Sequence, residues 1–272
     1  MSLDETCVSQ GELYTILTNK AGKGQAGSLV SMMQGTSSEV ILHYLSKLPR
    51  NKRLKVKELT IDLSPSMKLI AKKAFPNAMI VSDRFHVQKL MNEAISDLRI
   101  DYRWQAIDQE NSEIELAKEL GRKYVPHTFA NGDTRRQLLA RSRHIVMKHF
   151  TKWTYSQKQR AEILFEQYPS IKEAYDISME LTRIYNQKIS KNVAMTKLAR
   201  WYEQLEKLNL KYFNSVMETM QNNYQTITNY FENRSTNAAA ESFNAKVKAF
   251  RAQFRGLRDI PFFIFRLTKL FA

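Results

Sequence analysis

The chain has 272 residues, of which 42 are Lys or Arg and 27 are Asp or Glu, giving a formal net charge of +15. Hydrophobic residues make up 43%, which excludes a mostly disordered chain. The single cysteine, Cys7, excludes an internal disulfide and a multi-cysteine zinc site. No apolar run approaches the roughly 18 residues of a membrane span, so we expect a cytoplasmic protein without a membrane partner. The positive charge favours nucleic acid as a partner, and a solvated basic surface is the alternative.

The first hundred residues alternate between strand-like and helix-like stretches. Three strands come first, and strand–helix pairs follow. Pro65 suits the first turn of a helix, and Asp83 suits a helix N-cap. The patterns predict strands over residues 13–18, 27–35, 56–62 and 78–82, and helices over residues 37–48, 65–74 and 83–100. This order predicts an α/β fold with a mixed sheet covered by helices.

Residues 101–230 have a different character, because strand-like runs disappear and apolar residues recur with a period of about 3.6. This pattern predicts an all-helical block in which Trp104, Trp153 and Trp201 pack in the core, although one of them could stack on a nucleic-acid base. A cap cluster at residues 235–237 then begins a predicted helix that runs to about Phe254, and an apolar tail follows it.

Three acidic residues stand at positions that suit a metal site. Asp4 precedes the strand over residues 13–18, Asp62 ends a strand, and Glu241 lies in the first turns of the late helix. Carboxylates at strand ends of an α/β sheet are placed where sites are usually built, and two or three of them can hold a pair of Mg²⁺ ions for phosphodiester chemistry. Each acid also has a simpler interpretation: a helix cap for Asp62, a first-turn acid for Glu241 and an exposed terminal residue for Asp4.

Asp83 and His86 are three residues apart at a predicted strand-to-helix junction, with Arg84 between them. That spacing places the two side chains on one helical turn. They either form an N-cap with a polar neighbour, or they orient the metal-binding acids or contact DNA.

Basic residues follow Glu241 on or just beyond its predicted helix. Cations beside an acidic metal site suit a phosphate backbone that passes over it, and a solvated helix face is the alternative. The predicted DNA-binding residues are Arg84, Lys246, Lys248, Arg251, Arg255 and Arg258.

Two stretches carry a family resemblance: LTIDLSPSMKLIAKKAFPNAMIVSDRFHVQKLMNEAI and NRSTNAAAESFNAKVKAFRAQFRGLRDI. Together they resemble bacterial insertion-sequence transposases of the DDE superfamily, in particular the ISL-three-like group that includes the ISAon type. The resemblance implies an RNase H-like core interrupted by an all-helical insertion. It further implies that Asp4, Asp62 and Glu241 are the three catalytic, metal-binding acids, and that Asp83 and His86 match a related (Cys or Asp)-x-x-His motif that assists them.

The resemblance also implies a domain division and a reaction. We expect the first part of the core over residues 1–100, the insertion over residues 101–232 and the last part of the core over residues 233–272. The implied activity is Mg²⁺-dependent cleavage of transposon ends and strand transfer into target DNA, with two ions, Mn²⁺ as a substitute, and a homo-oligomer acting on DNA near the nucleoid.

The alternative is an inactive or truncated remnant that only binds DNA through its basic surface. The family's usual N-terminal DNA-binding region does not precede Asp4 in the sequence. We therefore expect it on a separate chain, or a truncated reading frame.

Overall fold

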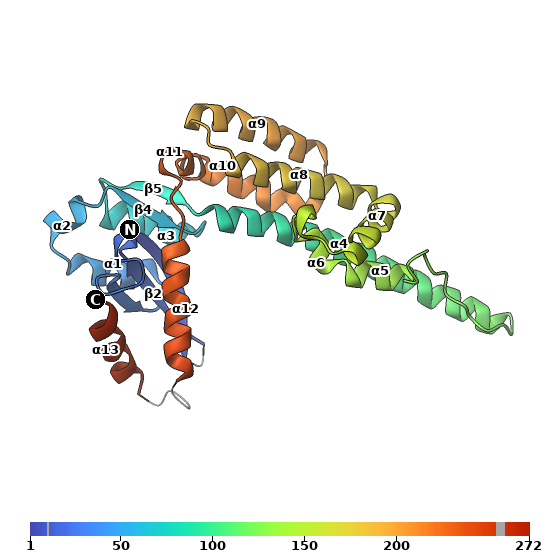
Figure 1. Ribbon diagram of the computed structural model, residues 1–272, viewed down its shortest axis with the longest axis horizontal. Coiled ribbons are helices and arrows are strands. Elements are labelled where there is room, and N and C mark those ends of the chain that lie inside the picture. Colours follow the sequence, from blue (N-terminus) through green and yellow to red (C-terminus); the bar gives the residue numbers. More distant parts are fainter. Residues whose placement is uncertain (10, 254–258) are drawn as a thin grey trace. The chain divides into compact units, whose positions relative to one another are not determined.

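The computed structural model describes residues 1–9, 11–253 and 259–272, which fall into two compact units (Figure 1). The first, the sheet unit, contains Met1–His86, Ile189–Lys191 and Asn222–Ala272. The second, the helical unit, contains Val87–Lys188 and Asn192–Gln221. The helical unit is therefore inserted in the chain between the first and last parts of the sheet unit.

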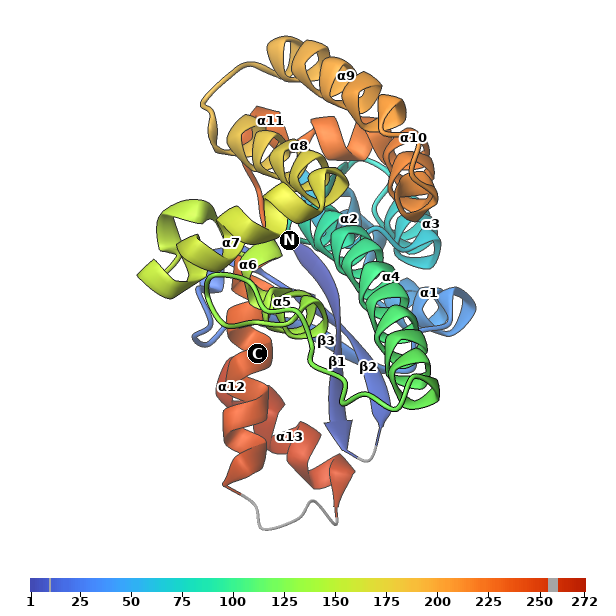
Figure 2. The same cartoon turned by 90° about the vertical axis from the view of Figure 1, so that its right-hand side faces the viewer.

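The sheet unit is built on one five-stranded mixed sheet. Its strands are β1 (Ser2–Ser9), β2 (Glu12–Thr18), β3 (Leu29–Gln34), β4 (Glu58–Ile61) and β5 (Met79–Ser82). Their order is β3-β2-β1-β4-β5, with the first three antiparallel and β1, β4 and β5 parallel to one another. Figure 2 shows β1, β2 and β3 as neighbouring arrows. The central strand β1 thus has a partner on both sides.

Local sequence signals begin and end the helices of the sheet unit. Pro65 occupies the first turn of its helix, and the Asp259 side chain accepts a hydrogen bond from the Phe262 N–H at 2.9 Å to cap the last helix. The helices are α1 (Ser38–Ser46), α2 (Arg50–Leu54), α3 (Pro65–Ala74), α11 (Tyr230–Asn233), α12 (Ala238–Ala252) and α13 (Ile260–Phe271).

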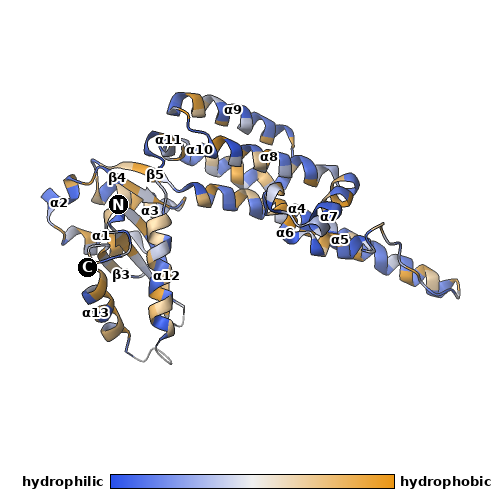
Figure 3. Ribbon diagram, in the orientation of Figure 1, coloured by the Kyte–Doolittle hydropathy of each residue, from blue (hydrophilic) through white to orange (hydrophobic). Residues whose placement is uncertain are grey.

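Strand alternation divides the core of the sheet unit between the two faces of the sheet. On one face, Leu3, Leu59 and Ile61 pack with buried residues of α1 and α3. On the other face, Tyr14 and Ile16 pack with buried residues of α12 and α13. Figure 3 shows the apolar colouring of α13 that this packing requires. Helices therefore cover both faces, as the α/β class demands.

The helical unit consists of amphipathic helices joined by short 3₁₀ turns and loops, and in Figure 3 both hydrophilic and hydrophobic colours recur along them. Its elements are α4 (Arg84–Glu119), α5 (Arg135–Arg141), α6 (Arg143–Val146), α7 (Tyr155–Gln167), α8 (Pro169–Asn186), α9 (Lys191–Lys207) and α10 (Asn214–Thr228), with a few end residues of α4, α9 and α10 belonging to the sheet unit. No described helix is long and apolar enough to cross a membrane.

The structure confirms the predicted α/β class, which is consistent with an RNase H-like core. The helix predicted to end near residue 100 is wrong in extent, because α4 continues to Glu119 before Gly121 breaks it. Trp201 is buried as predicted, but Trp104 is 60% exposed and does not belong to the core. Arg255 and Arg258 lie outside the described residues.

Candidate active site

The parallel pairing of β1 with β4 brings Asp62 within electrostatic range of Asp4. Ser2 of β1 pairs with Thr60 of β4 in a parallel ladder. Asp4 follows Ser2 by two residues in β1, and Asp62 follows Thr60 by two residues, just after the end of β4. Because Leu3, Leu59 and Ile61 face α1 and α3, both acids point to the face that α12 covers.

Two asparagines of α12 fasten this helix to β1 on either side of Glu241. Asn237, the N-cap residue, accepts a hydrogen bond from the Ser2 hydroxyl and is 1% exposed. Asn244, two turns later, donates from Nδ2 to Asp4 Oδ2 at 3.0 Å. Glu241 lies between them and is exposed. The helix therefore presents its carboxylate on the side that faces Asp4.

Electrostatics shows that four of the predicted residues lie near one another. Burial raises the pKa of Asp4. A hydrogen bond from the Glu5 N–H and the nearby His86 lower this pKa, while the charges of Asp62 and Glu241 raise it, and the net shift is upward. The structure thus brings Asp4, Asp62, Glu241 and His86 within electrostatic range.

The second acid also takes part in the turn that follows β4. Asp62 Oδ1 accepts a hydrogen bond from the Ser64 N–H at 2.9 Å, just before α3 begins. This bond orients one carboxylate oxygen, so the turn holds the acid at the end of its strand. A capping-type contact and a functional role are therefore compatible in this residue.

The donor chemistry of this cluster fits Mg²⁺. Carboxylate oxygens are the ligands that this hard cation prefers, and a cation would relieve the repulsion that raises the pKa of Asp4. Among the described residues, no group of three or more His, Cys, Asp or Glu side chains is close enough to hold an ion as they stand.

Asp83 has a different environment from the three acids. It is 1% exposed, and its Oδ1 accepts a hydrogen bond from the Phe85 N–H at 3.4 Å at the start of α4. Its charge acts on Lys20, whose pKa burial lowers. The neighbouring Arg84 lies over the Tyr230 ring at 5.8 Å. Asp83 therefore begins α4, which places His86 one turn further on.

The basic residues after Glu241 do not form one row. Lys246 is half-buried, and its ammonium donates to the Gly24 carbonyl at 2.5 Å, which ties the β2–β3 loop to α12. Lys248 is exposed and lies seven residues after Glu241, two turns along the same face of the helix. Arg251 is half-buried, one turn further. Lys248 is the cation best placed beside the acids.

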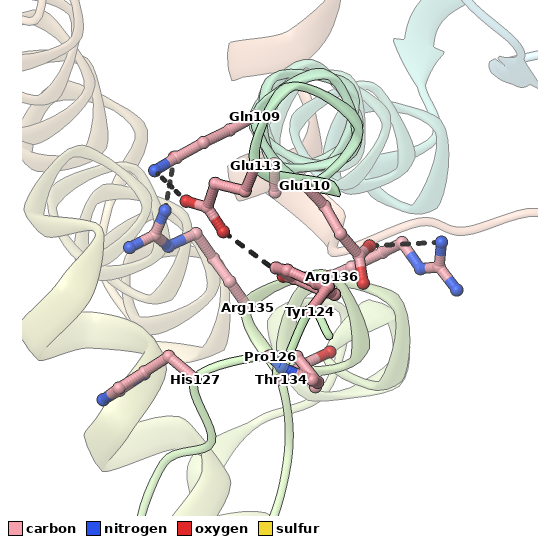
Figure 4. Close-up of a pocket in the computed structure, with 10 residues that line it drawn as sticks. Gln109, Glu110, Glu113, Tyr124, Pro126, His127, Thr134, Arg135 and Arg136 are labelled. Carbon is pink, nitrogen blue, oxygen red and sulfur yellow. Dashed lines mark hydrogen bonds and ion pairs between the residues drawn. The ribbon is translucent and has the colours of Figure 1, made fainter. Parts of the chain in front are cut away.

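One small cavity of about 50 Å³ lies in the helical unit and contains none of these acids (Figure 4). Its polar side chains bind one another. Glu113 accepts hydrogen bonds from Gln109 at 2.9 Å and Tyr124 at 3.2 Å, and Arg136 pairs with Glu110 at 3.2 Å. This network fastens the loop after α4 to that helix, and it leaves no set of free groups for a ligand.

Comparison with known proteins identifies the family of the chain. Residues 1–267 match the ISL3-type family of DDE transposases, whose description is "Transposase". The chain belongs to this family. It is also similar to the transposase for insertion sequence element IS1001 of Bordetella parapertussis, with 20% identity over 275 residues. That match covers 100% of the chain but 60% of the relative, so the chain spans about 60% of its length. No solved structure matches.

Two polar residues near the acids were not singled out from the sequence of this transposase-family chain. Asn244 follows Glu241 by three residues, a spacing that places both on one helical face and could have identified it. Glu5 neighbours Asp4; burial raises its pKa, and the charges of Asp62 and Asp4 raise it further. Glu5 therefore adds a fourth carboxylate to the electrostatics of this site.

Proposed function

We propose that this chain is a DNA transposase that cleaves phosphodiester bonds at transposon ends and joins the freed 3′ end to target DNA in a Mg²⁺-dependent reaction. The observation that carries the proposal is that Asp62 and Glu241 lie within electrostatic range of Asp4 on one face of the sheet, in a chain of the transposase family.

Asp4, Asp62 and Glu241 would hold the metal, in a two-ion arrangement. When bound, Mg²⁺ supplies an activated oxygen nucleophile and stabilises the leaving oxygen of the phosphodiester. Mn²⁺ would serve as a substitute. Asn244 holds the Asp4 carboxylate in place, and the turn at Ser64 holds that of Asp62. His86 partly opposes the net upward shift of the Asp4 pKa, and would thereby favour the ionised, metal-binding form of that acid.

DNA would follow the acid-bearing face of α12. Lys248 lies two turns beyond Glu241, about 10 Å along the helix axis, and Arg251 extends the basic character by one turn. Cations at these positions offer contacts to successive phosphates of a strand that enters the site. Asp83, which follows β5, and Arg84, the first residue of α4, would support the same region.

Replacement of single acids tests this proposal. Asp62→Asn and Glu241→Gln keep the size of each side chain, so they should abolish cleavage of labelled transposon-end DNA in Mg²⁺ or Mn²⁺ while sparing DNA binding. The matched control is Glu39→Gln, an exposed acid of α1 in the same unit. Unchanged cleavage in Asp62→Asn would refute the proposal.

The products distinguish related activities. Joined strands are expected from a transposase, and cut but unjoined products would indicate a nuclease. Binding of DNA by the parent protein without any metal-dependent nicking would favour a remnant that has kept only its basic surface.

A further inference from the structure

Three arginines gather in the helical unit where α4 meets the α5–α6 connection. Arg99 and Arg103 are four residues apart on α4, hence on one face of the helix, and Arg143 is the first residue of α6. Arg99 Nη1 donates to the Leu139 carbonyl of α5 at 2.6 Å. This bond packs the arginine face of α4 against the helix that ends just before Arg143. We call the three residues the arginine cluster.

No acid in the described parts of the chain neutralises this cluster. The positions three and four residues before and after each arginine contain no Asp or Glu. None of the three forms an ion pair with a described residue. Two of the three arginines of α5 differ, because Arg136 pairs with Glu110 and Arg141 pairs with Asp133.

The acids of α4 in this region face another way. Asp97 and Asp101 are each two residues from Arg99, which places them on the opposite side of the helix. There they act on Tyr212: burial raises its pKa, and the hydrogen bond to Asp101 and the charge of Asp97 raise it further, to about 12. In this part of α4, the two acids therefore lie on one side of the helix and the arginines lie on the other.

The environment of Arg99 is energetically unfavourable. It is 4% exposed, and its Nε is buried without a hydrogen-bond partner. Burial lowers its pKa, and the charges of Arg103 and Arg143 lower it further, so the three cations act on one another. Like charges held together with a desolvated donor destabilise a fold unless an anion compensates them.

We propose that Arg99, Arg103 and Arg143 form a binding site for phosphate oxygens of a DNA backbone, separate from the acids of the sheet unit. Arg103 and Arg143 are exposed and can reach a ligand, while Arg99 supports them from beneath. Guanidinium groups match phosphate in geometry and charge, and duplex DNA offers one charge about every 1.7 Å. This inference rests on DNA being the substrate proposed above.

Salt-dependent DNA binding of the full chain tests the site. A labelled duplex of 30 base pairs is titrated in EDTA across a range of salt concentrations, so that cleavage plays no part. The variant Arg103→Ala/Arg143→Ala should bind at least tenfold more weakly than the parent, and the slope of log K against log salt should fall by about two. The matched control Lys158→Ala/Arg200→Ala removes two exposed charges of the same unit and should change affinity less than twofold.

Three outcomes would overturn the site. Equal weakening by both double variants would mean that only overall charge matters. Unchanged binding by the arginine variant would remove the site outright. Thermal stabilisation of the parent by inorganic phosphate that the arginine variant loses, with DNA affinity intact, would mean that the cluster binds free anions. Arg103→Gln/Arg143→Gln repeats the test if the alanine variant melts at a lower temperature than the parent. Asp62→Asn reports on the proposed function separately, because it affects cleavage and not this binding.

Discussion

Replacement of Asn244 by alanine separates the positioning of Asp4 from the stability of the fold. In the folded chain, Asn244 Nδ2 donates to Asp4 Oδ2 at 3.0 Å and to the Glu5 carbonyl at 3.4 Å. The other end of the same amide, Oδ1, is buried and has no hydrogen-bond partner. Asn244→Ala therefore removes a favourable contact and an unfavourable one together.

The two effects have similar magnitudes. A hydrogen bond to a charged group contributes about 1.5–3 kcal/mol, and a buried unsatisfied acceptor costs about 1–3 kcal/mol. The free energy of unfolding of Asn244→Ala should thus stay within about 1 kcal/mol of the parent value. Catalysis has no such compensation, because Asp4 loses the contact that orients it. Loss of about 1.5–3 kcal/mol of positioning corresponds to a rate lower by about 10- to 160-fold, since each 1.36 kcal/mol is a factor of ten.

The assay compares single-turnover cleavage of transposon-end DNA with the urea unfolding midpoint of the same preparation. Ser242→Ala, an exposed neighbour on α12, is the control and should leave both unchanged. Raised Mg²⁺ should partly restore cleavage in Asn244→Ala, because a higher ion concentration offsets weaker binding by a poorly oriented Asp4 carboxylate, while the urea midpoint reports separately on the stability of the fold. Cleavage within threefold of the parent, or a loss of several kcal/mol of stability, would refute the reasoning.

Three further predictions concern the two units. Asp133→Asn should lower the free energy of unfolding by about 3 kcal/mol in urea titrations, because this fully buried carboxylate pairs with two arginines. Burial raises the pKa of Asp133, but the two arginine hydrogen bonds more than offset this effect and lower the pKa overall. The contribution of Asp133 to folding stability is therefore fully present above the unfolded pKa of about 3.9 and is lost as pH falls through the lower folded value. Acid unfolding of Asp133→Asn should lack this loss of stability. Gly22→Ala should destabilise the β2–β3 loop by about 1–3 kcal/mol in the same assay, since its Cβ would lie 2.5 Å from Ser28 Oγ and 2.7 Å from the Ser28 backbone nitrogen. Phe263→Ala should cost about 3–5 kcal/mol, because this ring is 1% exposed between α13 and the sheet, and a near-neutral effect would contradict the packing described.

Much of the local structure could be predicted from sequence because its signals are local. The strand predicted over residues 13–18 is β2, and the helix predicted over residues 65–74 is α3 with the same limits. Pro65 fixes the beginning of that helix, and Phe75-Pro76 ends it. The extent of α4 was not predicted, although the sequence allows it. Residues 101–119 contain neither Gly nor Pro, so no break separates them from the preceding turns of the helix.

The site could be predicted only in part, because its geometry depends on contacts between distant residues. Each acid alone has an ordinary structural role, and only strand order makes β1 and β4 neighbours. The basic residues after Glu241 do not lie in one row, for a simpler reason. Lys246 is five residues from Glu241, about 140° around the helix, so it cannot share the face that Lys248 occupies. Its bond to Gly24 is what that geometry allows.

The position of the acids depends on strand register more than on any one contact. Side chains alternate between the faces of a sheet, so a shift of one residue in β1 would turn Asp4 toward α1 and α3 and bring Leu3 to the polar face. The central place of β1, paired with β2 over most of its length and with β4 at Ser2, opposes such a shift. The α12 asparagines add a second constraint, because Asn237 and Asn244 contact Ser2 and Asp4 two residues apart on the same strand. The contacts of α12 with Ser2 and Asp4 therefore form only in this register of β1, and Glu241 lies within electrostatic range of Asp4 only when that register is kept.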